Sequence, residues 1–188
     1  TALGDNSGTG NVGGSQNTYI GSSTGTTSTL TGSNNTCVGF NAEPSVNTVS
    51  NEITLGNSSI TTLRCADSTI STFSDRRDKT EIKPLDYGLD FIEKIRPVQY
   101  KWKLRELNES DINNAKNNKV RAGFIAQELQ ESMPNNENEV LDLVNENNPE
   151  RLEIKQGNLI PMMVKAIQEL QAKVVSLEKK IEDMTSNN

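Results

Sequence analysis

The residues best suited to chemistry lie together in the run Ser74-Asp75-Arg76-Arg77-Asp78-Lys79. A serine hydroxyl is a poor nucleophile near neutral pH unless a base removes its proton, and a lysine amine becomes such a base when desolvation or neighbouring cations lower its pKa. Arg76 and Arg77 are such cations, although Asp75 and Asp78 could equally neutralise them. A serine and a lysine five residues apart also occur in ordinary polar turns. The pattern alone therefore leaves both a Ser-Lys dyad and a turn open.

The composition excludes most other catalytic systems. The chain of 188 residues contains no histidine, which removes Ser-His-Asp and Cys-His nucleophiles, imidazole bases and the commonest zinc ligands. The two cysteines, Cys37 and Cys65, form no CxxC pair, and we expect them to be small buried hydrophobic residues rather than a disulfide or a zinc site. No metal or cofactor is predicted, and no phosphate-binding glycine loop is visible.

Charge and hydropathy limit the partners. The formal net charge is -6 and no basic cluster occurs, which argues against a nucleic-acid surface. No apolar run approaches the roughly 20 residues that span a bilayer. No segment has the pattern of a signal peptide. We therefore expect a soluble protein without nucleic-acid or membrane partners.

The chain changes character near residue 74. Only five charged residues precede that point, whereas all others follow it. With 32% hydrophobic and 4% aromatic residues, a chain of this length cannot fill one compact monomeric core, so apolar surface is expected to come from sister chains. The first part is rich in Gly, Ser, Thr and Asn, a composition that by itself fits a flexible linker.

A repeat in the first part favours structure over a linker. An aliphatic residue followed by glycine recurs at spacings of 17, 18 and 17, as Leu3-Gly4, Ile20-Gly21, Val38-Gly39 and Leu55-Gly56. Fixed spacing with glycine at a turn position is typical of stacked short strands in a β-roll or solenoid. We therefore interpret residues 1 to about 60 as the end of a β-structured fibre or spike that is trimeric.

The second part alternates helical and strand patterns. A short helix is predicted where Phe91, Ile92 and Ile95 share one face, and Pro97 ends it. A strand follows in which Val98, Tyr100 and Trp102 alternate with polar residues. Further elements are a loop over 108–118, a strand over 120–124 and a helix over 125–133 that stops at Pro134.

The C-terminal segment carries a heptad seam. Apolar residues are spaced alternately by three and four positions, at Ile160, Met163, Ile167, Leu170, Val174, Leu177, Ile181 and Met184. Such a helix, about 37 Å long, is expected to pair with other copies, although packing on its own domain is the alternative. β-Branched residues at one seam position with Leu at the other favour a parallel dimer in isolated coiled coils, which conflicts with a trimer.

Four blocks carry a family resemblance. They read SDRRDKTEI, LDFIEKIRPVQYKWK, GFIAQELQESMP and LIPMMVKAIQELQAKV. In this order they closely resemble the intramolecular chaperone and auto-processing domain of phage endosialidase tailspikes, also found in other tail fibres, neck appendages and the myelin regulatory factor. The resemblance covers residues 74 to about 182. It implies a trimeric α+β protein with a fibre end at 1–73, a chaperone domain at 74–158 and its coiled-coil helix at 159–188.

The resemblance also implies site residues. Ser74 matches the nucleophile of the family and Lys79 its base. Asp75 and Arg77 also match the pattern of the family, and Arg77 is expected to support the dyad. Asp78 stands where an apolar residue is usual, and Glu81 where Asn is common. The implied cut lies between Ser74 and Asp75. Attack by a serine on its own carbonyl closes a four-membered ring, so a cut between Phe73 and Ser74, through a five-membered ring, is the alternative.

The function implied is that of a chaperone that trimerises and folds a viral fibre or spike and then cuts itself off. Its partners would be itself, as a homotrimer, and the N-terminal passenger; its location would be the virion, with the chaperone released in the host cytoplasm. A non-cleaving trimerisation cap is the alternative. The oligomerisation domain of a membrane-anchored transcription factor and a conventional enzyme fit less well. Gln127 and Glu128 could position the junction or bond between subunits, but their block also fits a simple strand-to-helix turn, so they receive no catalytic role.

Overall fold

The computed structural model describes residues 1–67, 69–103 and 119–186. The loop expected over 108–118 lies outside these residues. The chain divides into two compact units, one made of residues 1–70 with 147–150 and the other of 71–146 with 151–188. The first contains strands and turns, and the second mixes short strands with helices. The α+β class is thereby confirmed. The two units are described separately.

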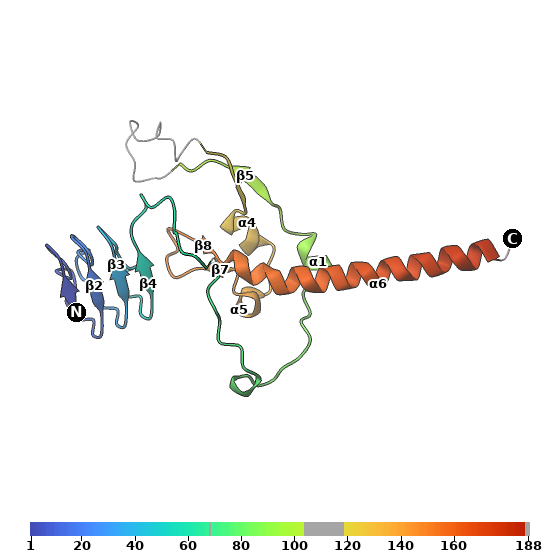
Figure 1. The fold of residues 1–188 in the computed structure, drawn as a ribbon, viewed down its shortest axis with the longest axis horizontal. Coiled ribbons are helices and arrows are strands. Elements are labelled where there is room, and N and C mark those ends of the chain that lie inside the picture. The colour runs from blue at the N-terminus through green and yellow to red at the C-terminus, as the bar shows by residue number, and fades with distance from the viewer. Residues whose placement is uncertain (68, 104–118, 187–188) are drawn as a thin grey trace. The chain divides into compact units, whose positions relative to one another are not determined.

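The first unit is built on the aliphatic-glycine repeat. Its strands are β1 (Ala2–Leu3), β2 (Thr18–Ile20), β3 (Thr36–Val38) and β4 (Ile53–Leu55). They pair in parallel and in chain order (Figure 1). Each strand ends at the aliphatic residue that precedes a repeat glycine. Each repeat therefore adds one short strand beside the previous one.

The repeat glycines are required by the close approach of successive repeats. Gly21 has a φ of +133°, and a Cβ placed there would lie 2.4 Å from the carbonyl oxygen of Gly39. Gly4 has a φ of +135°, and its Cβ would lie 2.5 Å from the carbonyl oxygen of Gly21. Side chains would be both strained and blocked at these positions. This explains why glycine recurs directly after each strand.

Two buried asparagines connect the repeats. Asn17 Oδ1 accepts the N–H of Asn35 at 2.8 Å, and Asn35 Oδ1 accepts the N–H of Glu52 at 3.0 Å. Their amide groups donate to the carbonyls of Gly32 and Val49, at 2.8 and 2.7 Å respectively. Buried backbone polar groups need such partners, because an unsatisfied group costs about 1–3 kcal/mol. The asparagines thus replace backbone partners that the short strands do not supply.

The core of the first unit is small. Its buried cluster consists of Tyr19, Leu30, Cys37 and Ala42. Cys37 is buried as expected, whereas Cys65 is exposed, and that expectation was wrong. Cys65 follows the last strand, in a stretch whose described residues from 60 to 84 are all exposed, so no core is available to cover it.

The second unit begins with short elements. They are the single-turn helix η1 (Arg76–Asp78), α1 (Leu89–Ile92), β5 (Val98–Tyr100), β6 (Arg121–Gly123) and α4 (Ala126–Glu131). β5 and β6 form an antiparallel pair. Both predicted strands are therefore present, although Trp102 lies beyond the end of β5 and packs edge-on against Tyr100. α1 ends at Ile92, well before Pro97.

The apolar residues of these elements meet in one core. Its buried members are Phe91, Leu129, Met133, Leu141, Leu143, Val144, Leu159 and Met162. Ile92, Ile95 and Phe124 pack against it while partly buried. Ile125, which was expected inside the helix predicted over 125–133, instead precedes α4 and is 36% exposed. The helical periodicity around Leu129 and Met133 therefore identified the core face, but not the first residue of the helix.

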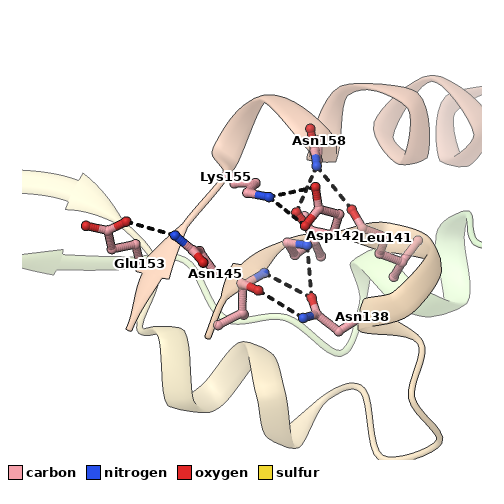
Figure 2. Close-up of polar contacts among 9 residues, drawn as sticks. Asn138, Leu141, Asp142, Asn145, Glu153, Lys155 and Asn158 are labelled. Atoms are coloured by element: carbon pink, nitrogen blue, oxygen red, sulfur yellow. Dashed lines mark hydrogen bonds and ion pairs between the residues drawn. The ribbon is translucent and has the colours of Figure 1, made fainter. Parts of the chain in front are cut away.

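A polar cluster joins the core to the C-terminal helix. It links α5 (Asn138–Leu141), β7 (Val144–Asn145), β8 (Glu153–Ile154) and the turn η2 (Gln156–Asn158). Figure 2 shows the Nζ of Lys155 directed at both carboxylate oxygens of Asp142, at 2.6 and 2.7 Å.

Two asparagines complete this cluster. The side chain of Asn138 accepts from the N–H groups of Leu143 and Val144 and donates to the carbonyl of Val144. Asn158 donates to the carbonyls of Leu141 and Asp142. These bonds satisfy the end of α5, where Asp142 adopts left-handed backbone with a φ of 47°. The cluster therefore fixes the turn that leads into the last helix.

The last helix, α6 (Leu159–Ser186), presents two different apolar faces. Leu159, Met162 and Ala166 are buried in the unit's own core. The heptad seam lies one position further along the chain, and its eight residues are 45 to 70% exposed. Beyond its first turns, α6 extends as a single rod (Figure 1). In the described part of the chain, the seam is therefore largely exposed. No described helix combines the length and apolar character needed to cross a membrane.

Candidate active site

The run from Ser74 to Lys79 forms one turn of helix. Asp75 precedes η1 and its Oδ1 accepts the N–H of Arg77 at 2.9 Å, which is the bond of an N-capping residue. The guanidinium of Arg77 returns to the same carboxylate through Nε and Nη2, at 3.0 and 2.6 Å. The side chain of Arg77, and to a smaller extent its N–H, hold the pKa of the Asp75 carboxyl below its usual value. The Asp75 carboxylate thus fixes the first turn of η1.

This turn brings Ser74 and Lys79 together. The Nζ of Lys79 lies 2.6 Å from the Oγ of Ser74 and donates a hydrogen bond to it. Ser74 precedes the cap of η1, and Lys79 follows its last residue with extended backbone. The helical turn therefore folds the chain back so that residues five apart in sequence touch. A serine and a lysine within hydrogen-bond distance are the arrangement that a nucleophile and its base require.

The pair is open to solvent in the single chain. Ser74, Lys79 and every residue of η1 are exposed, and the side chain of Phe73 is 100% exposed. Arg77 is paired with Asp75, and this ion pair raises the pKa of the guanidinium. Of the two arginines near Lys79, Arg77 is therefore neutralised by Asp75. The sequence had left open whether the arginines act as free cations or are neutralised in this way.

A comparison with protein families shows what this segment resembles. Residues 74–136 match the family model that carries a peptidase name and the description "Chaperone of endosialidase". Residues 74–136 are thus similar to a chaperone-of-endosialidase domain. The match begins at Ser74 and spans about a third of the chain. A search of curated proteins found no match.

The chaperone-of-endosialidase match confirms the resemblance seen in the four blocks. It supports an intramolecular chaperone role beside a fibre or spike passenger, in the context of a viral tail protein. The peptidase name of the family suggests a self-cleaving domain. The catalytic roles of Ser74 and Lys79, and the position of the cut, stay predictions.

The GFIAQE block of the matched segment holds a second charged pair. Glu128, on α4, accepts hydrogen bonds from Nε and Nη2 of Arg96, which precedes β5. The pairing raises the pKa of Arg96. Glu128 therefore holds α4 against the segment that leads into β5. Gln127 lies beside it on α4 and is exposed. This fits the structural role that the sequence suggested for the block.

Other reactive groups do not extend the site. Among the described residues, no group of three or more His, Cys, Asp or Glu side chains could hold a metal. Burial raises the pKa of the Cys37 thiol to about 11, so it is protonated and unreactive near neutral pH. The Lys155 and Asp142 pair of Figure 2 serves the turn after α5. Within the described part of the domain, Ser74 and Lys79 remain the candidate chemical pair.

One residue that supports this domain was missed by sequence reasoning. Glu169 on α6 accepts the N–H of Leu89, the first residue of α1, at 2.8 Å through Oε2. This bond, helped by Lys165, lowers the pKa of Glu169 against an opposing effect of desolvation. The two partners lie 80 residues apart, so no local signal could have paired them. The N-cap at Asp75, by contrast, could have been found from its residue type.

Proposed function

We propose that this chain is the end of a viral fibre or spike together with its trimerising chaperone, which cuts itself off through Ser74 and Lys79. The observation that carries the proposal is the 2.6 Å contact between Lys79 Nζ and Ser74 Oγ. It occurs at the first residues of the segment that matches the chaperone family. The contact places the hydroxyl of Ser74 within the distance at which the amine of Lys79 can accept its proton.

The reaction is an acyl transfer that consumes one water. Lys79, in its neutral amine form, accepts the proton of Ser74 Oγ as the oxygen attacks a peptide carbonyl. The C–N bond then breaks, and the leaving amine takes the proton back from Lys79. An ester on Ser74 remains, and water hydrolyses it to a carboxylic acid and the free hydroxyl. Each chain turns over once, because the substrate is its own backbone.

Two peptide bonds are candidates for the cut. The family resemblance favours the bond between Ser74 and Asp75. Attack by Ser74 on its own carbonyl closes a strained four-membered ring, whereas attack on the Phe73 carbonyl closes a five-membered ring. Attack on the carbonyl of another copy in the trimer avoids the strain. The masses of the fragments distinguish the bonds.

The heptad seam of α6 is the proposed assembly element. Its aliphatic residues are exposed although the helix packs another face on its own domain. Exposed apolar stripes of this length are buried in coiled coils. Three copies joined there hold the repeat units at high local concentration. The repeats are proposed to form the β-roll end of the passenger.

The need for a removable chaperone follows from folding physics. Interchain β-structure depends on contacts between distant residues, which form slowly and leave strand edges exposed to aggregation. A helical element that assembles first sets the register of the copies. Its later removal takes away the element from which unfolding would begin, so the fibre is kinetically trapped.

Self-cleavage is tested by the intact mass of the freshly purified, denatured protein. We expect two fragments from the parent and one uncut chain from Ser74→Ala and from Lys79→Ala. Ser71→Ala and Lys83→Ala are matched controls, since both residues are exposed neighbours of the same types, and both variants should be cut. A parent that stays full-length after long incubation would leave a permanent trimerisation cap, the alternative function.

Assembly is tested by sedimentation equilibrium. Leu170→Asp places a charge in the seam, whereas Ser176→Asp places the same charge on an exposed part of α6 outside it. All proteins are made in the uncut Ser74→Ala background. We expect Ser74→Ala alone and Ser176→Asp in this background to have the mass of three chains, and Leu170→Asp the mass of one. A trimer that survives Leu170→Asp would contradict the proposed role of the seam.

A further inference from the structure

Four aliphatic side chains form a column along the first unit. Leu3, Ile20, Val38 and Leu55 are direct partners in the register of β1 to β4. We call these four residues the aliphatic ladder. Leu3 is 66% exposed, Ile20 38% and Leu55 57%, and Val38 is partly buried. An apolar column of this kind is therefore open to solvent in the single chain.

The ladder lies on the side of the strands that faces away from the unit's own core. Successive residues of a strand point to opposite faces. Tyr19 and Cys37, which precede Ile20 and Val38, are 3% and 1% exposed and belong to the buried cluster. The ladder residues hence contribute nothing to that cluster. The folding of the single chain therefore does not explain why these four positions are aliphatic.

The surface suits a second copy of the same chain. The four strands contain no charged residue, so identical faces can approach without charge repulsion. The outward position two residues before the ladder is Thr18 in β2, Thr36 in β3 and Ile53 in β4. Such a face is uncharged, so identical copies related by one symmetry axis can bring it together at that axis.

The size of the ladder also bears on its partner. A stable interface between separate proteins buries more than about 1,000 Å², and a column of four aliphatic side chains is too small for that. The ladder can therefore hold an interface only between copies that another element already joins. In this chain, that element is the exposed seam of α6.

We propose that the aliphatic ladder packs against the ladders of the two other copies of this chain. The proposal rests on the trimer proposed above and adds the surface through which the repeat units meet. In a closed ring of identical copies, equivalent residues lie around the symmetry axis. Ile20 of each copy then lies near Ile20 of the others.

Cysteine cross-linking tests this geometry. Ile20→Cys is made in a Ser74→Ala and Cys65→Ser background, which keeps the chain uncut and removes the exposed native thiol. Val12→Cys in the same background is the matched control, because Val12 is an exposed aliphatic residue (68%) of the same unit outside the strands. Both proteins are treated with a short bismaleimide and run on a denaturing gel.

We expect covalent dimers from Ile20→Cys, at up to about two-thirds of the chains since one cross-link joins two of three copies, and single chains from Val12→Cys. Leu55→Cys, at the other end of the ladder, should behave like Ile20→Cys. Equal cross-linking of Val12→Cys would overturn the inference.

Sedimentation equilibrium of the same samples separates the two proposals. A trimer in which neither ladder cysteine cross-links would overturn the ladder interface but leave the proposed function intact. A protein with the mass of one chain would overturn both.

Discussion

Lys79 donates a hydrogen bond through Nζ to the Oγ of Ser74 across the single turn of η1. If Lys79 acts as the base, Lys79→Arg should abolish cleavage, since a guanidinium keeps the charge and the donor but does not release its proton. We expect the rate to fall at least about 10²-fold, the usual contribution of a general base. Intact mass over time measures it. Arg76→Lys is the control and should be cut. Cleavage of Lys79→Arg at the rate of the parent would show that residue 79 is needed only as a hydrogen-bond donor.

Asp75 is expected to set the geometry of the cut through its cap on η1. Asp75→Asn keeps an oxygen that can accept the N–H of Arg77, whereas Asp75→Ala loses both the cap and the ion pair. Asp75→Ala should slow cleavage about tenfold or more, because displaced reacting groups lose their alignment. Asp75→Asn should stay near the parental rate. Equal rates in all three proteins would show that the cap does not position Ser74.

The bond from Leu89 to Glu169 predicts a pH dependence of stability. The pKa of Glu169 is lowered in the folded protein, so its contribution is present above the unfolded value of about 4.3 and is lost as the pH falls through the folded value. Between pH 6 and pH 3, the melting temperature should fall less for Glu169→Gln than for the parent. Glu178→Gln, on the exposed part of α6, should follow the parent. Melting is compared at one protein concentration.

The buried side chain of Asn35 should be among the strongest contributors to the repeat unit. Asn35→Ala leaves the N–H of Glu52 and the carbonyl of Val49 without their partner, which should cost about 2 kcal/mol or more. Denaturant unfolding of the repeat unit measures the change. Ser15→Ala removes an exposed hydroxyl that contacts Ser33 and should cost less than about 1 kcal/mol. If Asn35→Ala left the free energy of unfolding unchanged, water would have to replace the hydrogen bonds of the side chain.

Two glycines of the first unit should respond differently to alanine. Gly21→Ala places a Cβ 2.4 Å from the Gly39 carbonyl at a φ of +133°, so the stacking of β2 on β3 should be lost. Gly13→Ala would meet only Thr31, at the ordinary distance of 3.6 Å, and should fold normally. Limited proteolysis of the repeat unit distinguishes them. Resistance of Gly21→Ala equal to that of Gly13→Ala would contradict the close approach seen between repeats.

The features predictable from sequence were periodic ones. Glycine after each aliphatic residue located the four strands because one backbone conformation recurs at one spacing. The heptad located α6. Its seam, which was expected to pair with other copies, is exposed in the single chain. The closeness of Ser74 and Lys79 was suggested only through family resemblance, since serine and lysine five residues apart are common.

Features made by distant residues were not predictable. The bond between Glu169 and Leu89 joins two helices that the sequence shows as separate patterns. The start of α6 depends on Asn158 and Lys155 meeting the end of α5. α1 is shorter than its apolar pattern suggested, because so short a helix depends on tertiary contacts rather than on its own propensity. The positions at which these helices begin and end therefore depend on tertiary packing.

In the proposed fibre, the one-strand repeat relates the length of the chain to the length of the fibre. Neighbouring strands lie about 4.8 Å apart, and each of the repeats between Leu3 and Leu55 adds one strand. Duplicating a whole repeat would extend the fibre by about that distance and leave both ends as they are. A partial duplication would carry the glycines out of line with their neighbours and halt the stack. The length of the proposed fibre can thus change in fixed increments while the sequence of the chaperone stays the same.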